Sequence, residues 1–244
     1  GVSAKTLKDL ISKTSFAVSR DELKPALTGV LFRFDEKELT AVATDGHRLV
    51  RYTRRDYSAD EFSGDVIVPR KFLSLLLGVL SGDDPIKMWM GDNHITASIG
   101  DDTYFTRIID ERFPDFESVI PKDNDKEFSA NKEELLSAVR RVSIFSNKST
   151  HQIALRLNKG ETQITTEDPE KASKAQEKIF GEFNGEDLEI GYNALYLKDI
   201  LSHVDDEKVE IKLKTAISAA LFYPGAQKEN AKLTMLLMPI RLND

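Results

Sequence analysis

The sequence predicts an α+β protein made of two similar halves, and three observations lead to this class. Amphipathic helical patterns recur at intervals of roughly sixty residues along the chain. Alternating apolar and polar runs, typical of antiparallel strands, fill the intervals. The order of helical and strand patterns in the first half then returns in the second. Helices followed by groups of antiparallel strands are typical of α+β folds.

Four segments have a helical period, and each has one apolar face that we expect to pack on a sheet. The predicted helices cover about Ser3–Phe16, Pro69–Ser81, Asn131–Phe145 and Tyr192–Val204. Pro69 favours a helix start because proline is well tolerated in the first turn. The expected inward residues are, helix by helix, Leu7, Leu10, Ile11 and Thr14; Phe72, Leu75, Leu76 and Val79; Leu135, Leu136, Val139 and Val142; and Leu197, Ile200, Leu201 and Val204.

Strand-like runs separate the helices in both halves. The first half has Val30–Phe34, Leu39–Val42, Asp65–Val68, Ile86–Met90, His94–Ile99 and Tyr104–Ile109. The second half has Ile153–Leu157, Glu161–Thr166, Leu188–Ile190, Val209–Leu213, Ala219–Tyr223 and Lys232–Leu237. Short words also repeat, since Ser3-Ala4 echoes Ser129-Ala130 and Gly82-Asp83-Asp84 echoes Val204-Asp205-Asp206. A stretch rich in proline and charge lies near 114–127, so we predict domains of residues 1–119 and 120–244.

Composition is that of an ordinary globular protein, with 40% hydrophobic and 31% charged residues. No apolar run approaches the roughly 20 residues that span a bilayer. The N-terminus has no signal-peptide pattern, so we expect a cytoplasmic location. The absence of cysteine excludes disulfides, thiolate catalysis and cysteine-ligated metals. Because Gly1 is not a Met start, we expect a chain trimmed or truncated at its front.

The net charge of −7 argues against a protein that grips DNA tightly, because such proteins usually carry a basic excess. Each predicted helix nevertheless carries at least one outward lysine or arginine. If the repeated helices share a face, that face is locally positive. The alternative is that these side chains only solvate the exposed sides of the helices.

The stretch Ala43–Leu49 follows the hairpin expected from the first two strands. Asp45-Gly46 lets the chain reverse, because glycine accepts a positive φ without steric cost. His47 and Arg48 then stand just past the turn, where a rigid hairpin can hold them toward a partner. One alternative is ordinary solvated surface. Another is a DNA-associated metal-dependent enzyme using Asp45 and His47. Against it, the stretch has no second histidine, no metal-ligand spacing and no nucleophile beside a base.

Four motifs in order carry a resemblance to a known family. They are Thr44–Leu49, Val66–Lys71, Arg112–Asp115 and Met238–Leu242. In identity, order and spacing they resemble the bacterial sliding clamps, the beta subunits of DNA polymerase III. The resemblance covers the whole chain but only the second and third of the family's three domains. It implies the DNA-clamp fold, in which each domain packs two helices on antiparallel sheets.

The resemblance implies a non-catalytic processivity factor without a cofactor or metal. Members form a homodimeric ring of six domains around duplex DNA, so topology rather than tight binding retains them. The absence of the family's first domain leaves open a chain that keeps peptide binding but cannot encircle DNA. The resemblance and helix positions suggest sequence-independent DNA contacts. The DNA-facing candidates are Lys5, Lys8, Arg70, Lys71, Lys132, Arg140, Arg141 and Lys198.

The resemblance also implies a hydrophobic cleft that binds short linear peptides of polymerase subunits, the clamp loader and repair proteins. Its first-half residues are Leu27, Thr44, Gly46, His47, Arg48, Leu49, Pro114 and Val119. Its second-half residues are Asn193, Tyr196, Ile217, Leu236, Leu237, Met238, Pro239, Ile240, Arg241 and Leu242. Aliphatic walls suit peptide Leu and Phe side chains, and methionine adapts to different partners.

Overall fold

The computed structural model describes residues 1–58 and 62–242, which form two compact units. The first comprises Gly1–Phe116 and Lys228–Thr234. The second runs from Glu117 to Gln227 and resumes at Met235. Asn243 and Asp244, which the predicted second domain includes, lie outside the described residues. No helix in the described part of the chain is both long enough and apolar enough to cross a membrane.

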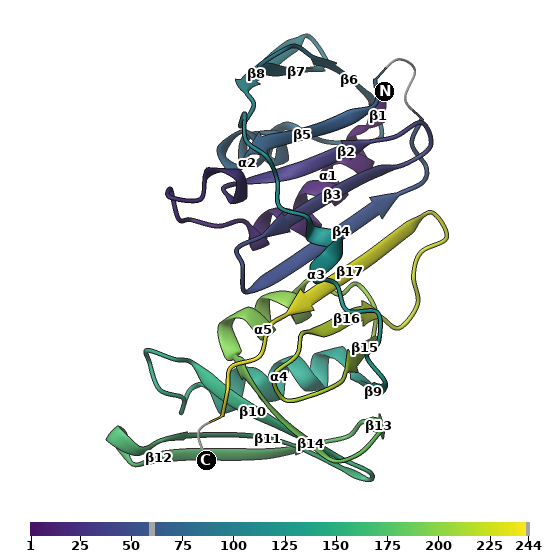
Figure 1. The fold of residues 1–244 in the computed structure, drawn as a ribbon. Helices are drawn as coiled ribbons and strands as arrows, with labels where there is room; N and C mark the ends of the chain where they lie inside the picture. Colours follow the sequence, from purple (N-terminus) through teal and green to yellow (C-terminus); the bar gives the residue numbers. More distant parts are fainter. Residues whose placement is uncertain (59–61, 243–244) are drawn as a thin grey trace. The chain divides into compact units, whose positions relative to one another are not determined.

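Besides the start of β17 (Ala231–Leu237), the first unit contains two antiparallel sets of four strands (Figure 1). One set is, in spatial order, β1 (Val2–Ser3), β6 (Pro85–Met90), β7 (His94–Ile99) and β8 (Asp102–Arg107). The other is β4 (Arg48–Arg54), β3 (Leu39–Thr44), β2 (Gly29–Phe34) and β5 (Gly64–Pro69). The inner positions of the second set are almost completely buried and form most of this unit's core.

Two helices, α1 (Ala4–Thr14) and α2 (Arg70–Val79), pack on the second set of strands. Short 3-10 turns at Ser15–Ala17 and Pro25–Leu27 follow α1. Ser3 caps α1 by accepting a hydrogen bond from the amide of Thr6 at 3.1 Å, which satisfies one of the unpaired donors of the first turn. The predicted inward face of α1 is buried throughout, so that prediction is confirmed.

The predicted inward face of α2 is wrong at two positions. Leu75 is 49% exposed and Val79 is only half-buried, whereas Leu73 and Leu80 are each 2% exposed. The run from Leu73 to Leu77 is apolar on nearly every side of the helix. Periodicity alone therefore could not determine which leucines meet the sheet.

The second unit repeats this arrangement with one extra strand. One set is β14 (Leu188–Asn193), β10 (Gln152–Asn158), β11 (Glu161–Asp168) and β12 (Ser173–Ile179). The other is β13 (Glu182–Asn184), β9 (Lys126–Asn131), β15 (Lys208–Leu213), β16 (Ala220–Pro224) and the end of β17 (Ala231–Leu237). The helices are α4 (Lys132–Ser143) and α5 (Ala194–Ser202), and their predicted inward residues are buried. A short helix α3 (Phe116–Val119) and a 3-10 turn at Pro169–Lys171 complete the elements.

One hydrogen bond recurs at the start of the first helix in both units. The amide of Ala4 donates to the carbonyl of Asp84 at 2.9 Å, and the amide of Lys132 donates to the carbonyl of Glu207 at 2.7 Å. Each acceptor immediately precedes a strand that pairs with the residues before the helix. The two units therefore share their chain order and this start of the fold.

This equivalence corrects the word repeats. Ser3 and Asn131 are the equivalent helix caps, so Ser129-Ala130 lies two residues out of register with Ser3-Ala4. Asp84 matches Glu207, so the repeats Gly82–Asp84 and Val204–Asp206 are out of register by one residue. The repeat is real in structure, but the short identities that suggested it are coincidental.

Some strands were not predicted, and one helix starts later than predicted. Strand β12 has almost no apolar side chains, so it gave no alternating hydrophobic signal. Strand β4 follows the Asp45-Gly46 turn directly, with two charged residues among its first four. Tyr192 was predicted to begin the last helix, but it is the buried penultimate residue of β14.

Candidate functional site

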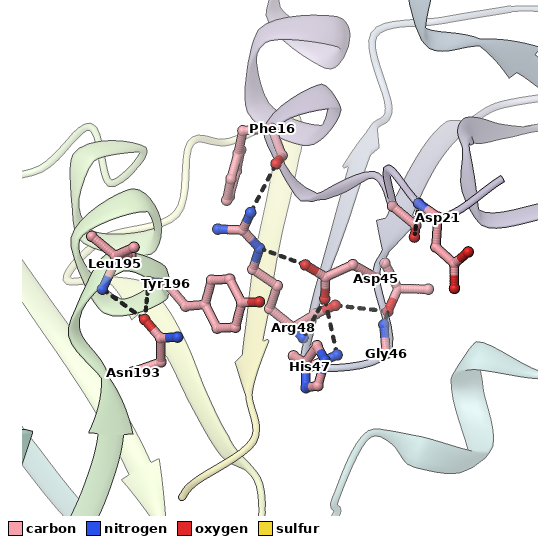
Figure 2. Close-up of polar contacts among 11 residues, drawn as sticks. Phe16, Asp21, Asp45, Gly46, His47, Arg48, Asn193, Leu195 and Tyr196 are labelled. Carbon is pink, nitrogen blue, oxygen red and sulfur yellow. Dashed lines mark hydrogen bonds and ion pairs between the residues drawn. The ribbon is translucent and has the colours of Figure 1, made fainter. Parts of the chain in front are cut away.

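The turn between β3 and β4 is held by a dense set of local hydrogen bonds (Figure 2). Asp45 Oδ1 accepts from the amides of His47 at 2.9 Å and Arg48 at 3.1 Å. The hydroxyl of Thr44 donates to the carbonyl of Arg48 at 2.7 Å and accepts from the amide of Gly46 at 3.1 Å. Gly46 has φ +89°, a conformation that L side chains rarely adopt. The predicted reversal is therefore present, with Asp45 and Gly46 fixing its shape.

Arg48 is committed to the interior of the first unit. Its side chain is 9% exposed, and Nε donates to Asp45 Oδ2 at 3.1 Å. Nη2 donates to the carbonyl of Phe16 at 3.1 Å, and the guanidinium lies 5.4 Å from the centre of the Phe16 ring. Both carboxylate oxygens of Asp45 thus have partners within the turn. Asp45 is therefore a structural residue of the turn. These contacts do not favour the alternative of a metal-dependent enzyme that uses Asp45 and His47.

The other first-half candidates differ in accessibility. His47 is exposed at the tip of the turn, Pro114 is exposed, and Leu27 is half-buried at the end of a 3-10 turn. Leu49 is 2% exposed and belongs to the core. Val119, which the sequence grouped with the first half, lies in the second unit and is 56% exposed.

In the second unit, the C-terminal segment crosses strand β14. The amide of Ile240 donates to the carbonyl of Gly191 at 2.8 Å, forming an isolated antiparallel bridge. A Cβ at residue 191 would lie 2.6 Å from the carbonyl oxygen of Ile240 and 2.7 Å from Leu242 Cδ2. Only glycine fits this approach without a shift of the segment. The bridge places Met238–Leu242 beside the end of β14, two residues before Asn193.

Asn193 prepares the start of α5. Its Oδ1 accepts from the amides of Leu195 at 2.9 Å and Tyr196 at 3.4 Å, as Figure 2 shows. These contacts fix the first turn of the helix. Because Oδ1 is used in capping, the amide nitrogen is the part of Asn193 that suits a partner's carbonyl. Tyr196 is half-buried, and Leu195 beside it is 41% exposed.

Two large apolar side chains are exposed at one end of the β16–β17 pair. Ala220 pairs with Leu237 as the last ladder position, so Ile217 before it and Met238 after it stand at the same end. Ile217 is 59% exposed and Met238 is 42% exposed. A turn holds Ile217 there, because its amide donates to the hydroxyl of Thr215 at 3.3 Å. This end of the unit, together with the crossing segment, is accessible apolar surface.

The remaining second-half candidates divide in the same way. Leu236 and Leu237 are 3% and 0% exposed and form core. Pro239, Ile240 and Leu242 are half-buried, and Arg241 is exposed. Sequence reasoning missed Gly191 and Leu195. A glycine inside a strand indicates a close backbone approach, so Gly191 had a detectable signal.

The candidate DNA-facing cations lie on helices of both units. In the first unit Lys5 and Lys8 are on α1, and Arg70 and Lys71 open α2, all four exposed. In the second unit the candidates are Lys132, Arg140, Arg141 and Lys198. Two of these are paired with carboxylates. Lys132 Nζ lies 2.6 Å from Glu133 Oε1, and Arg141 Nε lies 2.7 Å from Glu177 Oε1. The Arg141 side chain is 61% exposed, so its pair with Glu177 contributes little stability, whereas the Lys132 side chain is only 16% exposed.

Comparison with known families matches both halves of the chain in order. Residues 1–115 match the family described as the DNA polymerase III beta subunit, central domain. Residues 117–241 match the C-terminal domain of the same subunit. These matches confirm the predicted family and its two-domain coverage.

Individual relatives agree. The chain is 34% identical over 242 residues to the beta sliding clamp of Pseudomonas aeruginosa, covering 99% of this chain and 65% of that protein. It is 34% identical to the beta sliding clamp of Escherichia coli K12, covering 97% and 64%. The chain thus spans about two thirds of these relatives. A crystal structure of the P. aeruginosa subunit superposes with a TM-score of 0.92 at 33% identity, covering 99% of this chain and 66% of that chain. This likeness confirms the predicted α+β clamp fold.

A further similar structure is that of a sliding clamp from P. aeruginosa bound to griselimycin. It has a TM-score of 0.92 and 33% identity, and covers 99% of this chain and 64% of that chain.

Proposed function

Because the chain belongs to the DNA polymerase III beta subunit family, the bacterial sliding clamps, we propose that it supplies the middle and C-terminal domains of a clamp that encircles duplex DNA. The clamp tethers the replicative polymerase, the clamp loader and repair proteins through short peptides. It is an accessory protein without catalysis of its own and acts in the cytoplasm. The observation that carries the proposal is the succession of two like units, each matching its own domain of the family.

The charge distribution supports retention by topology. A ring that surrounds a duplex needs no large electrostatic attraction, so the net charge of −7 is compatible with it. A few helix-borne cations suffice for weak contacts with phosphates, and weak contacts permit sliding. The proposed contacts are the eight lysines and arginines already named on α1, α2, α4 and α5. Linear duplex DNA should therefore bind feebly and mostly at low salt.

The proposed peptide-binding residues in the second unit centre on Met238. The accessible residues are Ile217, Met238, Pro239, Ile240 and Arg241 with Asn193 and Tyr196 at the start of α5. Apolar side chains supply contact area, while Asn193 and Arg241 provide polar groups that orient a peptide. In the first unit, exposed His47 beside the rigid Asp45 turn is the accessible polar candidate. Buried Leu49, Leu236 and Leu237 support these surfaces from below.

Titration calorimetry with griselimycin tests the peptide-binding proposal directly, since clamps similar to this chain are known with it bound. A polymerase-type clamp-binding peptide is the second probe, with an expected affinity in the micromolar range, about −8 kcal/mol. Met238→Asp should weaken both by at least about tenfold, because it places a charge on the apolar contact surface. Phe180→Asp is the matched control, since Phe180 is 90% exposed in the same unit and outside the proposed surface. Equal affinity in wild type and Met238→Asp would refute the assigned surface.

Light scattering tests the ring. A closed dimer contains two chains, so a dimeric mass supports ring formation by this chain. A monomer that still binds griselimycin supports the narrower function of peptide binding without enclosure of DNA. Arg140→Glu should reduce the weak low-salt binding of linear duplex without changing griselimycin affinity. Unchanged duplex binding in this variant would remove Arg140 from the proposed DNA-facing set.

A further inference from the structure

One face of the β1–β6–β7–β8 sheet in the first unit exposes two aromatic rings in a single row. Trp89 on β6 pairs with Thr96 on β7, and Thr96 pairs with Phe105 on β8. Side chains of directly paired residues point to the same side of a sheet. Trp89 is 53% exposed and Phe105 is 70% exposed. The alternate residues Ile95 and Ala97 on β7 are buried, so the row faces away from the core.

Basic and hydroxyl side chains flank this row on both sides. On one side of the aromatic row, Lys87 pairs with Ser98, and Ser98 pairs with Thr103. His94 pairs with Arg107 on the other side. We call the eight outward residues of these three paired rows the aromatic face. They are Lys87, Trp89, His94, Thr96, Ser98, Thr103, Phe105 and Arg107.

The aromatic face differs in charge from the rest of the molecule. Its eight residues include a lysine, an arginine and a histidine but no carboxylate, although the chain has 41 acidic residues against 34 basic ones. Within the part of the chain that the structure describes, no ion pair engages Lys87 or Arg107. Two cations therefore stand beside two exposed rings, and neither is held in an ion pair with another described residue. That combination fits an anionic partner with flat, apolar groups.

We propose that the aromatic face binds single-stranded DNA without sequence preference. Unpaired bases stack on aromatic side chains, and cations beside the rings contact the phosphates. Trp89 and Phe105 lie two strands apart, about 10 Å, so each ring receives its own base. Duplex DNA keeps its bases stacked inside the helix and cannot use these rings. The choice of DNA rather than RNA rests on the proposed replication function. The argument for base stacking on the two rings does not depend on that function.

The tryptophan provides a direct reporter. The chain contains one tryptophan, Trp89, so selective excitation of tryptophan observes this face alone. Oligothymidine of about 20 nucleotides at about 50 mM salt should quench this fluorescence in a saturable way, because stacking brings a base onto the indole. Phe105→Ala should weaken the binding measured by this quenching about tenfold. Lys87→Ala and Arg107→Ala should each lower the dependence of log affinity on log salt by about one.

Phe180→Ala is the matched control, because it removes an exposed phenylalanine ring, 90% exposed against 70% for Phe105, from the other unit and should leave quenching unchanged. Absence of quenching, or an equal effect of Phe105→Ala and Phe180→Ala, overturns the proposal. Equal quenching by a duplex of the same length also overturns it. Arg140→Glu tests the duplex contacts of the proposed clamp and should not alter quenching. Failure of griselimycin binding, in turn, would count against the clamp function while leaving this face intact.

Discussion

The two units connect their first helix to the neighbouring strand in different ways, although their strand order is the same apart from the extra strand β13. In the first unit the hydroxyl of Tyr52 and Nη1 of Arg54, both on β4, each donate to Asp9 Oδ2 on α1 at 2.6 Å. Arg54 also donates to both oxygens of Asp56, at 2.9 and 2.5 Å. In the second unit an ion pair between Arg141 and Glu177 joins α4 to β12.

The Arg54–Asp9 pair and the Arg141–Glu177 pair differ in burial, and therefore in how much each contributes to stability. The side chain of Arg54 is 14% exposed and that of Asp9 is 21% exposed, whereas Arg141 is 61% exposed. Water screens the exposed pair, so it contributes little. A mostly buried charge that loses its partner keeps its desolvation cost. One architecture therefore carries a stabilising polar network in one copy and a surface ion pair in the other.

The largest effect is expected from Arg54→Met. It leaves Asp9 and Asp56 without their shared cation, so we expect a loss of about 2 to 3 kcal/mol in the free energy of unfolding of the first unit. Urea unfolding followed by the fluorescence of Trp89 measures this unit separately, because that tryptophan lies within it. Arg141→Met is the control and should cost under about 0.5 kcal/mol, measured by circular dichroism. Equal losses in the two variants would mean that burial does not distinguish the ties.

The return of the chain after the last strand sharpens the comparison. In the first unit the amide of Ile109 donates to the carbonyl of Ile67 at 3.0 Å. In the second unit the amide of Ile240 donates to Gly191 at 2.8 Å. Ile67 and Gly191 each lie two residues before the residue that precedes the second helix. The same bond therefore forms over a bulky residue in one unit and requires glycine in the other.

Gly191→Ala should accordingly destabilise the C-terminal crossing by about 1 to 3 kcal/mol, because the new Cβ meets a backbone oxygen. Faster hydrogen exchange of the Ile240 amide measures the effect, and weaker griselimycin binding should accompany it. Gly78→Ala is the control, since a Cβ there would meet no described atom within 4 Å apart from its chain neighbours and the backbone of its own helix. That change should stabilise α2 by about 0.5 to 1 kcal/mol. An unchanged exchange rate in Gly191→Ala would show that the segment shifts without cost.

The sequence alone was sufficient for the fold class and for most elements. The helical period was enough to predict the inward residues of α1, α4 and α5, because polar residues occupy the opposite side of those helices and leave one apolar face. Leu75 was misplaced because α2 is apolar nearly all round. Strand β12 gave no signal because its side chains alternate between half-buried and exposed without an apolar face. Periodicity thus works where an apolar face is set against a polar one, and it fails where side chains are apolar nearly all round or polar on both faces.

The candidate site was less predictable for a different reason. The motif around Asp45 marked a rigid turn, but the motif does not reveal that Arg48 folds inward onto the Phe16 carbonyl. Likewise Leu236 and Leu237 directly precede Met238 among the predicted cleft residues, yet of these three only Met238 is exposed. Family motifs identify neighbourhoods in the chain. Which members present their side chains depends on tertiary packing, which one-dimensional patterns do not encode.

The two units also differ in a buried tyrosine hydroxyl: Tyr52 in the first unit has a hydrogen-bond partner, and Tyr192 in the second has none among the described residues. Burial, with the hydrogen bond to Asp9, raises the pKa of Tyr52, so its hydroxyl remains a donor. Burial also raises the pKa of Tyr192, whose hydroxyl has no partner within the described residues. Tyr52→Phe should cost about 1 kcal/mol, whereas Tyr192→Phe should be neutral or slightly stabilising. The Tyr192 ring still packs edge-on against Phe222 after the change. Urea midpoints measure both, and a larger loss in Tyr192→Phe would indicate an unrecognised partner for that hydroxyl.

The smallest expected effect is on the stability of the first unit at acidic pH. The hydrogen bond from the Arg54 guanidinium lowers the pKa of Asp56 below its ordinary value. The unfolded chain then binds this proton more readily, so the stabilisation is present above about pH 4 and is lost as pH falls through the folded pKa. The urea midpoint of the first unit should fall between about pH 5 and pH 2.5, and it should fall less in Asp56→Asn because that carboxylate no longer titrates. Asp101→Asn, at an exposed turn of the same unit, is the control and should keep the wild-type fall. If Asp56→Asn and Asp101→Asn behave alike, the acid sensitivity of this unit has its origin outside the Arg54 network, and the contrast with the surface pair of the second unit reduces to the loss measured in Arg54→Met.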